Sequence, residues 1–296
     1  MNGKLEAKND ESDTKKQGEV WMRKIIDKCK VIIFDLDGTL YEGTSHFDYY
    51  AKQIEETLPV EQRPLFAEDY EKMKRGAHPL TIGKVYDKEY DVILTLDPLS
   101  LKAIEVHTWT GQKWRAEKVQ SIYSTPIIYD TARMIAVGDG WWLPYAAGAH
   151  YGAENMRSAY DKTKIYMSST DFHLPKTPGL QKALLKLRNE KKLVLITNSD
   201  ELDVKRLLRG LELHEVFDFV ITDALKPIET IKHFQMVISK HGVKAEEVVS
   251  IGDNFINEIS PALKLGMYAV YITPHPTEFR HHHLMTVPTL ANAFDK

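Results

Sequence analysis

Hydrophobic and polar positions follow two different patterns in two parts of this 296-residue chain. From residue 178 onward, short apolar runs that predict buried strands alternate with stretches whose apolar residues lie three or four positions apart, as in amphipathic helices. This alternation is typical of a parallel sheet with helices on both of its faces. We expect strands at 193–197, 216–221, 248–251 and 269–272. The second half of the chain therefore predicts a doubly wound α/β fold.

The helices between these strands have recognisable starts and ends. Thr177 can begin the first helix with Pro178 at its first position, and Asp200 or Ser199 can cap the second. The third predicted helix begins near residue 228 and can end at Gly242. Strand and helix thus follow each other at the short intervals that a Rossmann-like sheet requires.

A further buried strand is predicted at 31–34, directly before the sequence Asp35-Leu36-Asp37-Gly38-Thr39. Four consecutive bulky apolar residues indicate a central strand that is covered on both faces. Because side chains alternate along a strand, Asp35 and Asp37 can project to the same side. Open α/β sheets bind ligands at the carboxyl ends of their strands. Taken alone, the motif also fits an ordinary Asp-Gly turn, which is the structural alternative.

The segment between about 46 and 176 has a different pattern. It predicts short strands at 91–96, 103–109 and 113–118, and helices at 48–57 and 153–168. Because the segment leaves after the first strand of the sheet and returns before the second, we expect an inserted mixed α+β cap over the carboxyl edge.

The chain is therefore expected to contain three parts. Residues 1–20 carry nine charged residues and only four apolar ones, which predicts a disordered tail. The catalytic core is expected at 21–45 and 177–296, and the cap at 46–176.

Composition narrows the class of protein. A formal net charge of −3 provides no basic field for nucleic acid or an anionic membrane, so small molecules are the expected partners. The single cysteine, Cys29, cannot form an internal disulfide, and no apolar run approaches the roughly 18 residues that span a bilayer. With no recognisable signal peptide, we expect a soluble cytoplasmic protein.

Polar residues follow each predicted strand of the regular half, where the carboxyl ends of parallel strands meet. Besides the two aspartates, they are Thr197-Asn198-Ser199, Lys226, and Gly252-Asp253-Asn254 with Asn257 and Glu258. Carboxylates, one ammonium group, hydroxyls and amide donors suit Mg²⁺ and a phosphoryl group better than hydride or acyl chemistry.

These four groups of residues together resemble the four motifs of the haloacid dehalogenase (HAD) superfamily, in the same order and at similar spacing. The resemblance covers residues 31 to about 45 and 178–273. It implies that Asp35 is a nucleophile that forms an aspartyl-phosphate, and that Asp37 is the general acid and base. It also implies phosphate binding by Lys226, Thr197 and Asn198, and Mg²⁺ binding by Asp35, Asp37 through its backbone carbonyl, Asp253 and Glu258, the last of them through water.

Asp37 separates branches of the superfamily, because the dehalogenase branch lacks an acid at that position and the ATPase branch has threonine. The resemblance therefore implies a Mg²⁺-dependent phosphatase that hydrolyses a small phosphorylated metabolite. Two alternatives stay open: a phosphomutase of the same superfamily, and a regulatory binding module that keeps the fold without turnover. The sequence does not identify the phosphate ester.

Several weaker signals lie outside these motifs. Gly138-Asp139-Gly140 imitates the last motif and is expected in a cap loop, while Trp141 and Trp142 can either stack on a ligand or pack in the cap. Arg133 and His150 are expected in surface roles. The run 281–283 consists of histidines and is expected in an exposed loop, because consecutive histidines cannot all face one metal ion.

Overall fold

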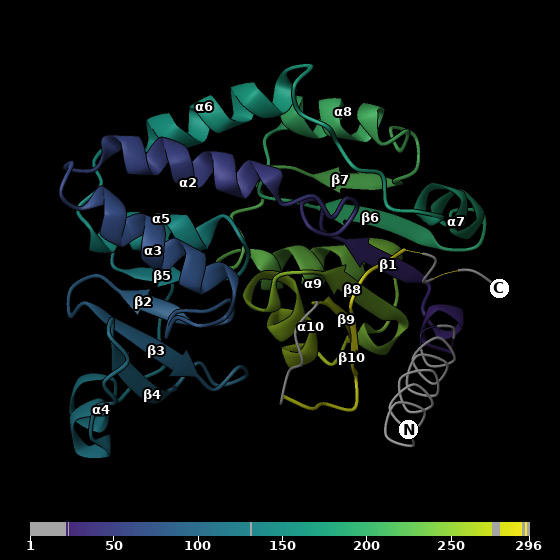
Figure 1. Ribbon diagram of the computed structural model, residues 1–296. Coiled ribbons are helices and arrows are strands. Elements are labelled where there is room, and N and C mark those ends of the chain that lie inside the picture. The colour runs from purple at the N-terminus through teal and green to yellow at the C-terminus, as the bar shows by residue number, and fades with distance from the viewer. Residues whose placement is uncertain (1–21, 23, 131, 274–278, 292–293, 295–296) are drawn as a thin grey trace, which may run out of the picture. The chain divides into compact units, whose positions relative to one another are not determined.

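The computed structural model describes residues 22, 24–130, 132–273, 279–291 and 294 (Figure 1). The chain forms two compact units. The first contains the described residues up to Glu42, with Leu174–Asp253 and the described residues from Asn257 onward. The second contains Gly43–His173 together with Asn254–Ile256. The second unit is thus an insertion into the first.

Six strands among the described residues of the first unit form one parallel sheet in the order β10-β9-β8-β1-β6-β7. Their bounds are β1 Val31–Phe34, β6 Lys192–Ile196, β7 Phe219–Ile221, β8 Val248–Gly252, β9 Tyr268–Ile272 and β10 Leu284–Val287. Numbered along the chain, this is the Rossmann order, in which the direction of winding reverses next to the first strand. The reversal lies between β1 and β8, where such sheets bind their ligands.

The central position of β1 follows from its composition. All four of its residues are buried, and Ile33 pairs with Val194 of β6 on one side and Ser250 of β8 on the other. The ladder continues beyond the strand, because the Asp35 backbone N–H donates to the Ile251 carbonyl over 3.0 Å. The first residue of the predicted site is therefore held by the sheet itself.

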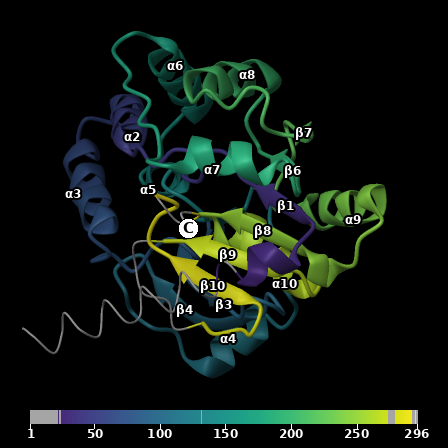
Figure 2. The same cartoon turned by 90° about the vertical axis from the view of Figure 1, so that its right-hand side faces the viewer.

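Helices cover both faces of this sheet (Figures 1 and 2). They are α7 Leu180–Leu187, α8 Glu201–Gly210, α9 Thr230–His241 and α10 Ser260–Lys264, with a 3₁₀ turn at Ala245–Glu247 and a π-helical turn at Phe255–Ile259. Asp200 caps α8 by accepting from the Asp203 N–H over 3.0 Å, and Gly242 ends α9 in the left-handed conformation, as predicted. The predicted parallel α/β fold is confirmed.

Three details of the first unit differ from the prediction. Helix α7 begins after Gly179 and not at Thr177, whose hydroxyl instead donates to the Leu40 carbonyl over 3.2 Å. Ile228 lies before α9 and is 65% exposed, so it does not belong to the apolar face of that helix. Strand β9 is not the last, because β10 pairs with it in parallel after the histidine run.

The second unit contains a four-stranded antiparallel sheet among its described residues, in the order β4-β3-β2-β5 (Figure 1). Its strands are β2 Val85–Asp87, β3 Val92–Leu96, β4 Ala103–Thr108 and β5 Met134–Ala136. Its helices are α2 Ser45–Thr57, α3 Arg63–Lys74, α4 Ala116–Ile122, α5 Trp142–His150 and α6 Met156–Ser168. The predicted mixed α+β insertion is therefore confirmed.

Two hydrophobic clusters of the second unit follow the alternation of side chains along its strands. Tyr86 and Ile93 face one cluster with α2, α3 and α5, whereas Val85 and Val92 face the other cluster with α4. Helix α4 lies where the sequence pattern predicts a strand at 113–118. Its Ala-Glu-Lys start favours a helix, and Val119 and Tyr123 pack together on the sheet with helical spacing.

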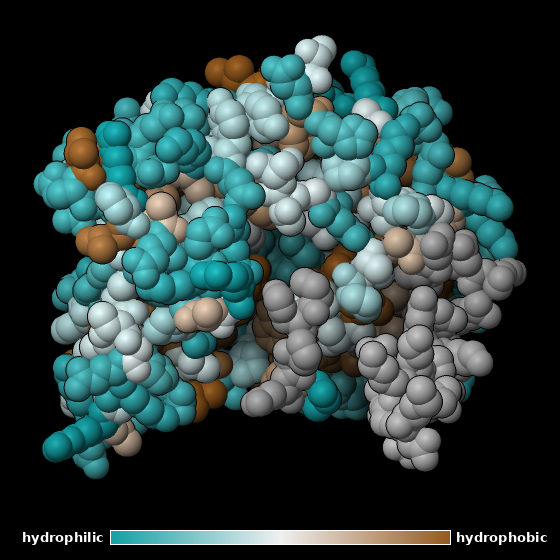
Figure 3. Space-filling model, viewed as in Figure 1, coloured by the Kyte–Doolittle hydropathy of each residue, from teal (hydrophilic) through white to brown (hydrophobic). Residues whose placement is uncertain are grey.

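The hydropathy of the surface agrees with a composition in which 27% of the residues are charged. The face shown in Figure 3 is mostly hydrophilic, with hydrophobic residues scattered over it. No helix of the described part of the chain is long and apolar enough to cross a membrane.

Candidate active site

The predicted site residues of the first unit all follow strands of its parallel sheet. Asp35 and Asp37 follow β1, Thr197 and Asn198 follow β6, Lys226 follows β7, and Asp253 with Glu258 follows β8. Because neighbouring parallel strands end at the same edge, the sheet brings these residues from four separate segments to one place.

A buried ion triad forms the base of the site. The Lys226 ammonium lies 2.6 Å from Asp35 Oδ1 and 2.6 Å from Glu258 Oε1. Their side chains are 2%, 8% and 4% exposed. The three charges are therefore paired out of water, and the loss of Lys226 would leave two buried carboxylates without their cation.

Burial and ion pairing have opposing effects on the pKa values of Asp35 and Lys226. Burial raises the pKa of Asp35, although the positive charge of Lys226 opposes that shift. Burial would lower the pKa of Lys226, but the attraction of Asp35 and Glu258 outweighs it, so the pKa of this ammonium is raised above its ordinary value. Lys226 is thus held as a cation in the loop that follows β7.

Asp37 has a different environment from Asp35. Its carboxylate is partly exposed, and its partners are two hydroxyl groups rather than an ammonium. The Tyr41 hydroxyl donates to Oδ1, and the Ser199 hydroxyl donates to Oδ2 over 3.0 Å. Burial raises the pKa of Tyr41 well above its ordinary value, and the negative charge of Asp37 adds to the shift. The two aspartates, two residues apart, therefore have different hydrogen-bond partners, although the negative charge of Asp37 also helps to raise the pKa of Asp35.

The loops after β6 and β7 are hydrogen-bonded to each other. The side chain of Asn198 donates to the Lys226 carbonyl over 3.0 Å and accepts from the Lys226 N–H over 2.7 Å. The Ala224 N–H donates to the Thr197 carbonyl over 3.0 Å. The side chain of Asn198 thus holds the backbone of Lys226, a contact that its predicted role in phosphate binding did not anticipate.

Asp253 lies directly against the loop that carries the two aspartates. Gly38 has a φ of +73°, and a Cβ atom at this position would overlap the Asp253 carboxylate. Among the described residues, no three His, Cys, Asp or Glu side chains lie close enough together to hold a metal ion by themselves. Glu258 in particular is engaged with Lys226.

Tyr41 was absent from the residues that the sequence indicates for this site, whereas Ser199 was identified in the motif after β6 and as a possible helix cap, without a contact to Asp37. Asp200 takes that capping role, which leaves the Ser199 hydroxyl for Asp37. The signal that could have indicated Tyr41 is its position in the same loop, four residues after Asp37. Spacing alone does not indicate where an aromatic hydroxyl points, so the signal was weak.

The weaker signals of the second unit have structural roles. The Trp141 ring packs among aromatic rings, with centroids 5.0 Å from His46 and 5.2 Å from Tyr50. Arg133 donates twice to the buried Asp87, and His150 lies 2.6 Å from Asp91. Ring packing for Trp141 and contacts with aspartates for Arg133 and His150 therefore account for these side chains within their own unit.

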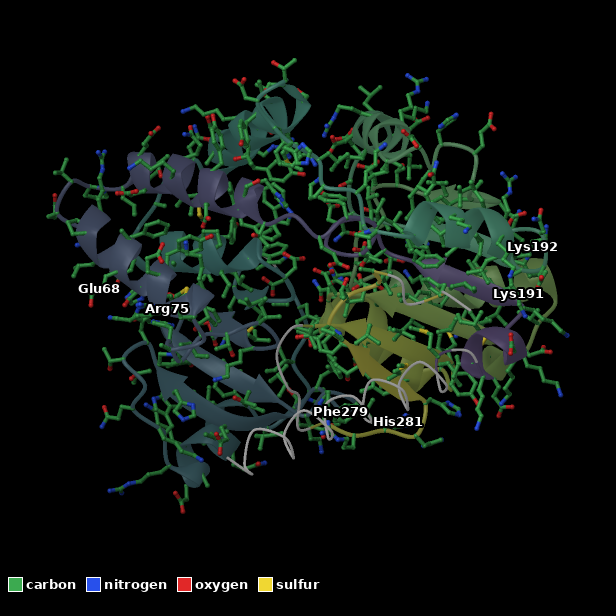
Figure 4. All side chains as sticks on the ribbon, turned by 45° about the vertical axis from the view of Figure 1, so that its right-hand side comes forward. Glu68, Arg75, Lys191, Lys192, Phe279 and His281 are labelled. Atoms are coloured by element: carbon green, nitrogen blue, oxygen red, sulfur yellow. The ribbon has the colours of Figure 1, made fainter. Side chains whose placement is uncertain are left out.

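The histidine run lies outside the site as well. His281 and its two neighbours form the turn that leads into β10 (Figure 4), and only His282 of the three is exposed, whereas His281 and His283 are half-buried. The same figure shows Lys191 and Lys192 on the outside of the first unit, where Lys192 pairs with Asp218 over 2.9 Å.

The chain is similar to proteins of one family. It is 28% identical to a glyceraldehyde 3-phosphate phosphatase of Pyrococcus furiosus over 116 residues, which are 38% of this chain and 46% of that protein. The chain thus matches less than half the length of this curated relative.

Solved structures that resemble the chain include two hydrolases. One is a haloacid dehalogenase-like hydrolase from Xanthomonas campestris, with 17% identity, a TM-score of 0.43, and coverage of 89% of this chain and 92% of the other. Another is a HAD phosphatase from Thermococcus onnurineus, with 16% identity, a TM-score of 0.44, and coverage of 89% and 95%. The family model for haloacid dehalogenase-like hydrolases matches residues 29–266, which is most of the chain, so the protein belongs to this family of hydrolases.

Proposed function

We propose that this hydrolase is a Mg²⁺-dependent phosphatase that hydrolyses a small phosphomonoester through a phosphate carried on Asp35. The observation that carries the proposal is the different surroundings of the two aspartates after β1. Asp35 is buried beside the Lys226 ammonium, whereas Asp37 is partly exposed and bonded to two hydroxyls. One carboxylate is thereby suited to attack phosphorus and the other to move a proton.

In the first step, a carboxylate oxygen of Asp35 forms a bond to phosphorus while the bond from phosphorus to the ester oxygen breaks. Asp37 gives its proton to that departing oxygen, so the alcohol leaves neutral. In the second step, Asp37 takes a proton from water as the water oxygen bonds to phosphorus and the Asp35–phosphorus bond breaks. Inorganic phosphate is released, and both side chains return to their starting states.

The phosphoryl group needs donors that balance its negative charge. Lys226 supplies a fixed cation next to Asp35, and Glu258 accepts a hydrogen bond from the same ammonium and thereby restricts its position. Thr197 and the backbone N–H of Asn198 lie at the end of the neighbouring strand and are proposed as further donors to phosphoryl oxygens. Binding and orientation of the phosphate are the tasks of these three residues.

Asp35, Asp253 and the backbone carbonyl of Asp37 are the groups that would hold Mg²⁺. The donor set fits this ion, because all three groups are oxygen ligands and the missing side chain of Gly38 leaves space that the Asp253 carboxylate fills. Bound Mg²⁺ would screen the repulsion between an anionic phosphate and the carboxylates. Glu258 supports the site through Lys226 in this arrangement.

The partial relative supports the same class of substrate, since it is a phosphatase named for a small phosphorylated metabolite. Phosphate release from 4-nitrophenyl phosphate and from a panel of phosphorylated metabolites, with Mg²⁺ or with EDTA, tests the proposal. We expect inorganic phosphate in stoichiometric amounts with the alcohol, and turnover only when Mg²⁺ is present. Transfer of the phosphoryl group to a second position of the substrate, without free phosphate, would identify a phosphomutase instead.

Gly38→Ala is expected to weaken Mg²⁺ activation strongly. The new methyl group would push the Asp253 carboxylate away from the loop, and a left-handed backbone costs a non-glycine residue about 1–2 kcal/mol. We expect the Mg²⁺ concentration for half-maximal activity to rise by about tenfold or more, as for a displaced metal-site residue. A titration of activity against Mg²⁺ measures this shift.

Gly76→Ala is the matched control for this change. Gly76 has a similar φ of +67°, but nothing lies within 4 Å of a Cβ atom built on it. It should therefore show the backbone strain without the displaced carboxylate. An unchanged Mg²⁺ requirement in Gly38→Ala, with stability lowered as in Gly76→Ala, would remove Asp253 from the proposed metal site.

A further inference from the structure

Both oxygens of the Asp37 carboxylate accept a hydrogen bond from a hydroxyl group, and the two hydroxyls come from different parts of the chain. Tyr41 donates to Oδ1 from the same loop, and Ser199 donates to Oδ2 over 3.0 Å from the loop after β6. No residue of the predicted catalytic set contributes these contacts. They therefore raise the question of what the two hydroxyls do for the reaction.

The backbone holds Tyr41 in place for this contact. The Leu40 N–H donates to the Leu36 carbonyl over 2.9 Å, and the turn brings the backbones of Asp37 and Tyr41 together in an isolated parallel bridge. The Tyr41 side chain is fully buried, so its ring cannot move without disturbing the core. Its hydroxyl is thus a rigid donor.

Ser199 is held from the opposite direction. It is 6% exposed, and its backbone N–H donates to Thr197 Oγ1 over 3.1 Å at the end of β6. The following residue, Asp200, is fixed as the cap of α8. Two donors on two separately anchored loops therefore define the plane of the Asp37 carboxylate, which a single donor would leave free to rotate.

We propose that Tyr41 and Ser199 are positioning residues that hold the Asp37 carboxyl group in the orientation in which it passes a proton to the leaving oxygen of the ester. The inference rests on the proposed phosphatase function. A misplaced proton donor slows its own step much more than it slows binding, because the transferred proton requires close approach and alignment. Neither hydroxyl is expected to contact the substrate.

If the two hydroxyls have this role, the loss of activity on removing either of them depends on the leaving group of the ester. 4-Nitrophenolate is stable enough to depart without a proton, whereas the alkoxide of glycerol phosphate needs one. kcat/KM reports all steps up to the departure of the alcohol, so it isolates the step in which Asp37 acts as an acid. A hydroxyl that only stabilises the fold would affect both substrates equally.

The experiment compares wild type with Tyr41→Phe on 4-nitrophenyl phosphate and on glycerol 3-phosphate, at saturating Mg²⁺. We expect kcat/KM to fall by about 30-fold or more for glycerol 3-phosphate and by less than about threefold for 4-nitrophenyl phosphate, within the range of general acid catalysis. Ser199→Ala should also lower kcat/KM more for glycerol 3-phosphate than for 4-nitrophenyl phosphate, but by a smaller factor than Tyr41→Phe. Ser199→Thr, which keeps the hydroxyl, should recover activity towards glycerol 3-phosphate.

Tyr123→Phe is the matched control, because it removes a buried tyrosine hydroxyl that donates to an aspartate, Asp87, over 2.7 Å in the second unit. It should leave the ratio of the two kcat/KM values unchanged. If Tyr41→Phe does not fold, Ser199→Ala and Ser199→Thr provide the same comparison. Equal losses on both esters, or no loss, would overturn the positioning role. If the wild type does not hydrolyse glycerol 3-phosphate, the alkyl phosphate of the metabolite panel that it hydrolyses fastest takes its place in the comparison. A wild-type protein that releases phosphate from 4-nitrophenyl phosphate and from every member of the panel at no measurable rate would overturn the proposed function, and this inference with it.

Discussion

Asp35→Asn is expected to abolish phosphate release, with a fall in kcat of about 10⁴-fold or more, as when the nucleophile of a covalent mechanism is removed. An amide cannot form the acyl phosphate, whereas its size and shape match those of the carboxylate. Lys226 keeps Glu258 as a partner in this variant, so the fold should persist. Initial rates with 4-nitrophenyl phosphate, together with the melting temperature, measure both effects.

Asp218→Asn is a suitable comparison for this variant. Asp218 lies in the same unit and accepts from the Leu193 N–H over 2.9 Å and from Lys192, but it lies outside the proposed site. It should lower stability slightly and leave kcat within about twofold, as surface substitutions usually do. Turnover by Asp35→Asn at the wild-type rate, with the same need for Mg²⁺, would refute Asp35 as the nucleophile. A phosphate adduct trapped on the 31–37 peptide of the wild type would support it directly.

Lys226→Met should both inactivate and destabilise the protein. Its removal leaves Asp35 and Glu258 as two buried carboxylates without their common cation, and breaking a buried pair in this way costs about 3–5 kcal/mol. Four of the five tryptophans lie in the second unit, so tryptophan fluorescence reports mainly on the unfolding of that unit and not of the first unit, which contains the triad. Hydrogen exchange of the β1 amides is therefore the appropriate measurement.

The double variant Lys226→Met with Glu258→Gln separates stability from activity. Replacing Glu258 removes one of the two unpaired charges, so part of the lost stability should return. Activity should not return, because the cation beside the phosphate is still missing. Full recovery of turnover in the double variant would contradict the proposed role of Lys226 in phosphate binding. Unchanged exchange of the β1 amides in Lys226→Met would contradict the structural importance of the triad.

The local pattern of residues was sufficient for much of the first unit. Four consecutive bulky apolar residues at 31–34 indicate a central strand, and β1 has that position between β6 and β8. Asp200 and Gly242 were identified as helix boundaries because capping depends on the few residues next to the helix end. Such features depend on neighbours in the sequence, which is why they can be predicted from it.

The second unit was less predictable, and for a physical reason. Strands β2 and β5 have three residues each and acquire their partners only across the sheet, so their own sequences carry little periodicity. The segment from Ala116 begins with residues that favour a helix, but the pattern at 113–118 predicted a strand, and the packing of the helix on the antiparallel sheet is a contact that the sequence does not display. Strand β10 similarly depends on the free edge of β9. Tertiary contacts determine the secondary structure of short segments more than intrinsic propensity does.

The sequence by itself determined that carboxylates, an ammonium group and hydroxyls would follow the strands of a parallel sheet, because strand ends and helix starts are local features. Only the tertiary structure decided how these groups share partners. It pairs Lys226 with both Asp35 and Glu258, and it bonds Asp37 to Tyr41 and Ser199. Contacts between residues up to 191 positions apart depend on strand order and loop packing, and no local pattern records them.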